Sequence, residues 1–111
     1  MTAIQFIRGT DEEVTPKVRL TRSRSGDQGT AEFTFENPKA FSQNLTKNFE
    51  GMYMIDEEGE ITCLEVKAKF VNGEPKSLFA TYVMKSQAKW DRFMRFMERY
   101  ATEYGLEFNK T

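Results

Sequence analysis

Alternating apolar and polar residues over the first three-quarters of the chain predict a series of short β-strands. Ile4 and Phe6 alternate with polar neighbours, which is typical of a strand with one buried face. Residues 18–20 and 31–35 alternate in the same way on either side of the turn-rich segment 25–29. These two segments predict a β-hairpin with one apolar and one polar face.

After this hairpin the sequence predicts a short helical turn followed by a loop. Asn37 is a favourable N-cap residue, and Pro38 suits the first helical position. The helical turn is therefore expected within residues 37–41. Residues 42–50 are mostly polar and predict a loop.

Two further alternating segments, on either side of Asn72-Gly73, predict a second hairpin. The register of the apolar rows decides the length of its loop. A two-residue loop would place Leu78 on the wrong face of the sheet. A three-residue loop, residues 72–74, pairs Ala68 with Leu78 and Leu64 with Tyr82, so both apolar rows share one face. We therefore predict the three-residue loop, with Gly73 in the left-handed conformation.

The C-terminal segment predicts one long amphipathic helix. Ser86 is a favourable N-cap residue, and Gly105 ends the apolar pattern. Apolar residues recur at the spacing of one helical face at Trp90, Phe93, Met94, Met97, Tyr100, Ala101 and Tyr104. The opposite face has arginines at 92, 95 and 99, diluted by acidic residues, and is expected to be solvated. Contact with anionic lipid head groups or with an acidic loop is the alternative.

Strands followed by one long helix indicate an α+β fold. We expect an antiparallel β-sheet or a small β-sandwich built from hairpins and closed by the C-terminal amphipathic helix. The length of 111 residues suits one hydrophobic core, so residues 1–111 are expected to form a single domain.

Composition argues against an enzyme. The chain has no histidine, and its one cysteine, Cys63, has no second cysteine to pair with and no histidine to activate it. Cys63 is expected to be a small apolar residue in a strand. We expect no catalytic residue, no metal and no cofactor. No stretch approaches membrane-spanning length, and Met1 to Arg8 lacks a targeting pattern, which favours a cytoplasmic or equivalent compartment.

Arg19, Arg22 and Arg24 flank the loop of the first hairpin. They could protect an edge strand by their charge, or they could anchor acidic groups of a partner. A small RNA-binding module that uses these arginines is the alternative interpretation. The net charge of −1 and the lack of an RNP-type aromatic motif make it the less favoured one, so no nucleic-acid partner is expected.

The most suggestive candidate for partner contact is an apolar segment followed by an acidic turn. Met52, Tyr53, Met54 and Ile55 are apolar on both faces, so this strand is either buried in the centre of a sheet or offered to a partner at an edge. Asp56 and Glu57 begin the acidic turn, which continues with Glu58 and Glu60. The turn could be solvated, could bind a basic partner, or could bind a divalent cation, although its spacing does not match the EF-hand loop.

Several blocks of the sequence resemble the Psb28 family of photosystem II proteins. The resemblance is strongest in residues 4–9, 18–24, 51–61, 83–86 and 90–101. It extends from about Ile4 to Phe108 and therefore covers nearly the whole chain.

The resemblance implies a non-enzymatic assembly factor that is peripheral to the thylakoid membrane, on its cytoplasmic (stromal) face. Members of the family associate transiently with photosystem II intermediates that contain the inner-antenna chlorophyll protein. They are thought to contact loops of the reaction-centre subunits and the tail of the antenna protein, and so to alter the immature acceptor side. Combined with the candidates above, this predicts a contact strip of Arg19, Arg22, Arg24, Met52, Tyr53, Met54, Ile55, Asp56 and Glu57.

Overall fold

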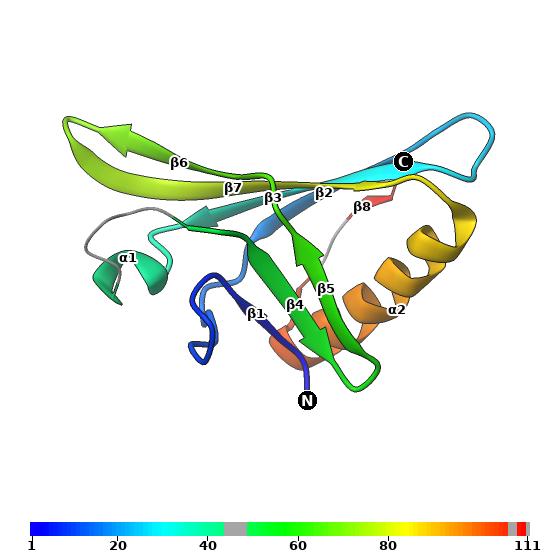
Figure 1. Ribbon diagram of the computed structural model, residues 1–111, viewed down its shortest axis with the longest axis horizontal. Helices are drawn as coiled ribbons and strands as arrows, with labels where there is room; N and C mark the ends of the chain where they lie inside the picture. Colours follow the sequence, from blue (N-terminus) through cyan, green and yellow to red (C-terminus); the bar gives the residue numbers. More distant parts are fainter. Residues whose placement is uncertain (44–48, 107–108, 111) are drawn as a thin grey trace.

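Two β-sheets and one long helix enclose the hydrophobic core (Figure 1). The computed structural model describes residues 1–43, 49–106 and 109–110. Along the chain the elements are β1 (Ala3–Gln5), β2 (Lys17–Arg22), β3 (Gly29–Glu36), α1 (Ala40–Gln43), β4 (Met52–Asp56), β5 (Gly59–Cys63), β6 (Val66–Val71), β7 (Glu74–Met84), α2 (Gln87–Tyr104) and β8 (Asn109–Lys110).

The smaller sheet has the strand order β1-β4-β5, and the larger one has the order β6-β7-β3-β2-β8. All neighbouring strands are antiparallel except β2 and β8. The first hairpin is confirmed, since β2 and β3 pair from Lys17–Thr34 to Arg22–Gly29. The α+β fold with a closing C-terminal helix is also confirmed.

The larger sheet buries only one of its faces. Along β3, Ala31, Phe33 and Phe35 are buried, whereas Glu32 between them is exposed. Burial of a phenylalanine side chain of this kind stabilises a fold by roughly 1.5–3 kcal/mol. In Figure 1 the smaller sheet and both helices lie on the same side of the larger sheet, so the opposite face has no layer of described residues over it.

Helix α2 begins and ends at the residues that the sequence predicts. The Ser86 hydroxyl accepts a hydrogen bond from the Lys89 amide, and Gly105 ends the helix with a left-handed φ of 69°. Phe96, which is not part of the predicted apolar stripe, is also fully buried and stacks on Tyr100. The helix packs against both sheets, through β4 and β7, so its buried surface is wider than one stripe.

The second hairpin differs from the prediction in its loop but not in its pairing. Asn72 and Gly73 both have positive φ, and β6 and β7 meet directly around them in a two-residue turn. The predicted three-residue loop is therefore wrong. A β-bulge at Lys76 shifts the register, so Ala68 still pairs with Leu78, as expected. Leu64 does not pair, because the chain passes from one sheet to the other between Cys63 and Val66 and leaves this side chain 75% exposed.

The short helix α1 is stabilised by a residue far away in the sequence. Asn37 adopts a left-handed φ of 49°, and the buried Glu12 carboxylate accepts hydrogen bonds from the amides of Lys39 (2.7 Å) and Ala40 (2.9 Å). These bonds satisfy two of the free amides at the helix start. Much of the loop predicted at 42–50 lies outside the described residues.

Candidate functional site

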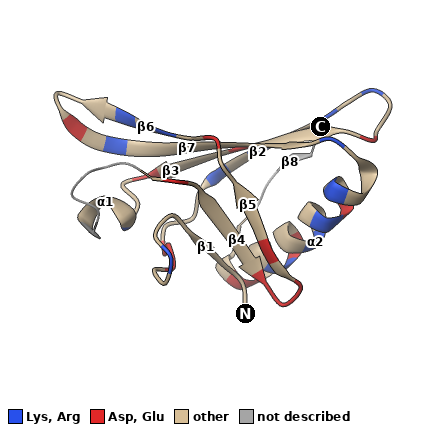
Figure 2. Ribbon diagram, in the orientation of Figure 1, with Lys and Arg blue, Asp and Glu red and all other residues tan. Residues whose placement is uncertain are grey.

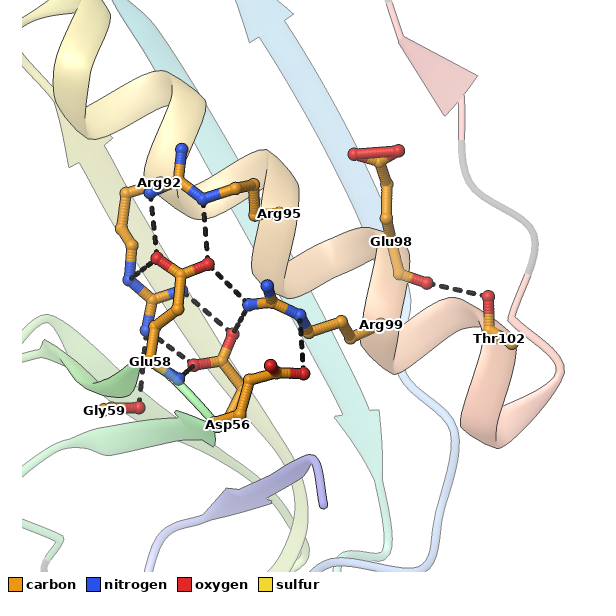
Figure 3. Close-up of polar contacts among 9 residues, drawn as sticks. Asp56, Glu58, Gly59, Arg92, Arg95, Glu98, Arg99 and Thr102 are labelled. Atoms are coloured by element: carbon orange, nitrogen blue, oxygen red, sulfur yellow. Dashed lines mark hydrogen bonds and ion pairs between the residues drawn. The ribbon is translucent and has the colours of Figure 1, made fainter.

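The acidic turn between β4 and β5 is bound by three arginines of α2 (Figure 3). Arg92 donates two hydrogen bonds to the Asp56 carboxylate, at 2.7 and 2.9 Å, and Arg99 donates a third at 2.8 Å. Arg95 makes a bidentate pair with Glu58, at 2.8 and 2.9 Å. Arg99 also bonds to Glu58 at 2.7 Å and so joins the two carboxylates. We call this set of five residues the arginine–carboxylate cluster.

The cluster answers two questions that the sequence left open. The arginine ridge of α2 is not simply a solvated face, because it ties the helix to the turn of the smaller sheet (Figure 2). The Asp56 side chain is 0% exposed, and its oxygens are occupied by Arg92, Arg99 and the Glu58 amide. Among the described residues no three histidine, cysteine, aspartate or glutamate side chains converge on a possible metal position.

The cluster makes stability depend on pH in the acid range. Burial acts to raise the pKa of Asp56, but hydrogen bonds from Arg92 and Arg99 outweigh it and lower the pKa from 3.8 to about 2. Hydrogen bonds from Arg95 and Arg99 lower the pKa of Glu58 from 4.5 to about 2. A pKa that is lower in the folded state adds stability above the unfolded-state value, and this stability is lost as the pH falls toward the folded-state value.

We therefore expect the urea midpoint of unfolding to fall as the pH is lowered from 4.5 toward 2. In the double variant Asp56→Asn, Glu58→Gln the midpoint should depend less steeply on pH over the same interval. Urea titrations at several pH values measure both slopes. Equal slopes in the two proteins would contradict a role of the cluster in acid sensitivity.

The three arginines of the predicted contact strip point to different parts of the molecule. Arg19 lies on the outer face of the larger sheet, opposite Glu32. The Arg22 guanidinium stacks on the Trp90 ring at 4.8 Å and donates to the Gln87 side chain. Arg24 is exposed in the loop between β2 and β3. The three arginines therefore do not form one binding site for an acidic group.

The apolar segment is the central strand of the smaller sheet, which is the first of the two alternatives left open by the sequence. β4 lies between β1 and β5, so neither of its edges is free. Met52 and Met54 are fully buried, Tyr53 is buried under the Arg8 guanidinium, and Ile55 is partly buried. Partner binding by the strip stays a prediction, and its exposed members are the three arginines and Glu57.

The structure instead exposes an unpaired strand edge that the sequence did not single out. β6 is the end strand of the larger sheet, and among the described residues no strand pairs with its outer edge. Its polar positions are Lys67 and Lys69, and at its tip Phe70 and Val71 remain 49% and 46% exposed. We call residues 66–71 the β6 edge. The sequence signal was present, because two apolar residues stand directly before the Asn72-Gly73 turn, where they extend beyond the core.

No helix within the described part of the chain is both long enough and apolar enough to cross a lipid bilayer.

Comparison with known proteins identifies the family. The model of the Psb28 protein family matches residues 4–108. The photosystem II reaction center Psb28 protein of Trichodesmium erythraeum (strain IMS101) is 66% identical over 110 residues, covering 99% of this chain and 97% of the relative. The proteins of the same name from Nostoc sp. (strain PCC 7120) and Trichormus variabilis (strain ATCC 29413) are each 62% identical over 111 residues, covering both chains completely. The resemblance seen in the sequence is confirmed, and this chain belongs to the Psb28 protein family.

Proposed function

We propose that this protein is a non-catalytic assembly factor that binds transiently to immature photosystem II. Its site of action is the cytoplasmic (stromal) face of intermediates that contain the inner-antenna chlorophyll protein, where it modulates the acceptor side. The names of the relatives, photosystem II reaction center Psb28 protein, support the association with photosystem II. The finer points rest on the resemblance of the sequence to this family.

The observation that supports binding most directly is the β6 edge. An unpaired edge offers a row of backbone amides and carbonyls to an extended segment of another protein, and such strand addition obtains affinity from main-chain hydrogen bonds. The end of the β6–β7 hairpin extends beyond the rest of the molecule in Figure 1, so an incoming strand meets no obstacle from the described elements there. Flexible loops and chain termini of a membrane complex are suitable donors of such a strand.

The side chains of the β6 edge indicate what kind of segment fits. Lys67 and Lys69 point to the outer face and favour acidic neighbours on the incoming strand. Phe70 and Val71 offer apolar surface at the tip, where a partner would bury them. The preferred partner segment is therefore extended, acidic along one face and apolar at one end.

Binding of this kind acts through conformation and needs no active site. A loop that is held as an added strand cannot adopt another conformation, so the binding energy shifts the loop population of the immature complex. The protein itself is pre-organised for this role, because the arginine–carboxylate cluster and the core fix α2 against both sheets. The sequence has no histidine, and burial raises the pKa of the Cys63 thiol, so the reactive thiolate is disfavoured.

The location that goes with this function is peripheral to the thylakoid membrane.

The RNA-binding alternative gains no support from the structure. Arg22 is engaged by Trp90 and Gln87, Arg19 lies on the outer face of the larger sheet and Arg24 lies in the loop, so the hairpin does not present a continuous basic platform.

A charge reversal tests the proposal. Tagged protein with Lys69→Glu is expected to recover at least about tenfold less photosystem II from solubilised thylakoid membranes, because loss of a central interface contact of about 1.4 kcal/mol or more has that effect. Lys85→Glu is the matched control, since Lys85 is also an exposed lysine but lies beyond the opposite end of β7. Quantitative immunoblots of reaction-centre and antenna subunits measure recovery. Equal recovery with both variants would overturn the β6 edge as the contact, and no recovery with the unmodified protein would overturn the assignment to photosystem II.

A further inference from the structure

A groove of about 390 Å³ lies between β5, β7 and the first turns of α2. In Figure 1, β5 and α2 lie on the same side of the larger sheet, away from the tip of the β6–β7 hairpin. The residues that line it are Ile61, Thr62, Tyr82, Ala88, Lys89 and Arg92, with Glu60 at the rim. Its volume lies at the lower end of the range that ligand-binding clefts have.

The floor of the groove is apolar and rigid. Ile61 is buried in the core, and the partly buried Tyr82 ring packs on Phe93 with a centroid distance of 5.5 Å. A side chain placed on this floor would lose water on one face without any movement of the core. The floor therefore suits an apolar or aromatic group.

The charged groups at the rim of the groove differ in whether they already have an ion-pair partner within the protein. Glu60 already accepts two hydrogen bonds from Arg8, at 2.7 and 3.0 Å, and one from the Thr62 hydroxyl. Arg92 is engaged by Asp56. The Lys89 ammonium forms no ion pair with any carboxylate in the described part of the chain. The rim therefore has one uncommitted charge, and it is positive.

We propose that this groove is a second docking site, which binds an acidic segment of a protein partner through a carboxylate on Lys89 and a neighbouring apolar side chain on Ile61 and Tyr82. The Tyr82 hydroxyl, which donates no hydrogen bond to a described residue, is an additional donor for the segment. Burial raises the pKa of Tyr82, so this hydroxyl remains protonated at neutral pH.

Charge and shape favour a peptide over other anions. A nucleic acid or a multiply charged phosphate would meet only one uncommitted cation in the groove. The apolar floor would then stay unused. An acidic peptide with an aromatic neighbour uses both halves of the groove.

Two synthetic peptides test the proposal by titration into the ¹⁵N-labelled protein. Acetyl-Glu-Phe-Glu-amide is expected to shift the amide resonances of Thr62, Tyr82 and Lys89, whereas acetyl-Gln-Phe-Gln-amide should do so more weakly. Lys89→Gln should weaken binding of the acidic peptide by roughly fivefold, the size expected for one exposed ion pair. Lys67→Gln is the matched control, because Lys67 lies on the β6 edge, and it should leave the affinity unchanged.

Each other outcome would overturn the docking site. Shifts scattered over the surface, or equal shifts with both peptides, would show that no acidic segment is recognised. Equal shifts with inorganic phosphate would show a general anion effect, and shifts that depend on protein concentration without peptide would show self-association. The site does not depend on the β6 edge, since Lys69→Glu should lower recovery of photosystem II and leave this peptide affinity intact.

Discussion

Asp56→Asn is expected to lower the free energy of unfolding by about 3 kcal/mol, which is the size of loss found when one partner of a buried ion pair is removed. Asp56 is fully buried, and both of its oxygens accept bonds from arginines of α2. The amide of an asparagine can replace only one of these acceptors, so the Arg92 and Arg99 guanidinium groups would lose bonds that bridge the turn and the helix. Urea unfolding followed by circular dichroism measures the change.

Glu57→Gln is the matched control for this variant. Glu57 belongs to the same turn and also pairs with Arg99, at 3.4 Å, but its side chain is 72% exposed. Exposed pairs contribute less than about 1 kcal/mol, so this substitution should change stability little. If both variants lost the same stability, the burial of Asp56 would not be the reason for its importance.

Gly29→Ala is expected to destabilise the protein by about 2 kcal/mol through overpacking. A Cβ atom at this position would lie 2.2 Å from Cζ3 and 2.3 Å from Cε3 of Trp90, and 3.0 Å from the Thr21 carbonyl oxygen. The first residue of β3 is thus a glycine because the Trp90 ring lies directly against the backbone. The Arg22 guanidinium also lies over the Trp90 ring, 4.8 Å from its centroid.

A double-mutant cycle separates this contact from a general effect of the substitution. Trp90→Phe removes the part of the ring that approaches residue 29. In the Trp90→Phe protein, Gly29→Ala should therefore lower the free energy of unfolding by less. Urea midpoints of the four proteins give the coupling energy. An identical cost of Gly29→Ala with tryptophan and with phenylalanine at position 90 would show that the ring is not the cause.

The elements of the fold could be predicted from the sequence because they depend on local pattern. The alternation in β2 and β3, the Ser86 cap and the Gly105 end of α2 each follow from a few neighbouring residues. The register of the second hairpin was also accessible, since the apolar rows required Ala68 to face Leu78. The length of the loop could not be predicted. A β-bulge at Lys76 restores the register that a two-residue turn would otherwise shift, and no local feature of the sequence marks that bulge.

The position at which the chain passes from one sheet to the other could not be predicted, because it depends on a break in an apparently continuous alternation. Residues 64–65 connect β5 to β6, yet their sequence continues the pattern of a single strand. The same division makes β4 a central strand and β6 an edge. The candidate contact surface therefore moved from Met52–Ile55 to the β6 edge only when the pairing of strands was known.

The partners of charged residues were equally inaccessible from the sequence. The arginines of α2 and the acidic turn are more than 30 residues apart along the chain, and each group on its own resembles a solvated surface. Only the packing of α2 beside β4 brings them together. This packing buries the Asp56 side chain, which is then not available to a partner. Arg22 is a similar case, since its stacking on Trp90 requires α2 to pass under the end of β2 and β3.

Photo-crosslinking tests the central claim, that the β6 edge contacts photosystem II, most directly. p-Benzoylphenylalanine in place of Val71 should give crosslinks to a subunit of photosystem II in thylakoid membranes stalled before maturation. The same group in place of Glu57, an exposed residue of the acidic turn, should give few or none. Crosslinks to photosystem II from position 57 and none from position 71 would contradict the account and favour the acidic turn as the contact.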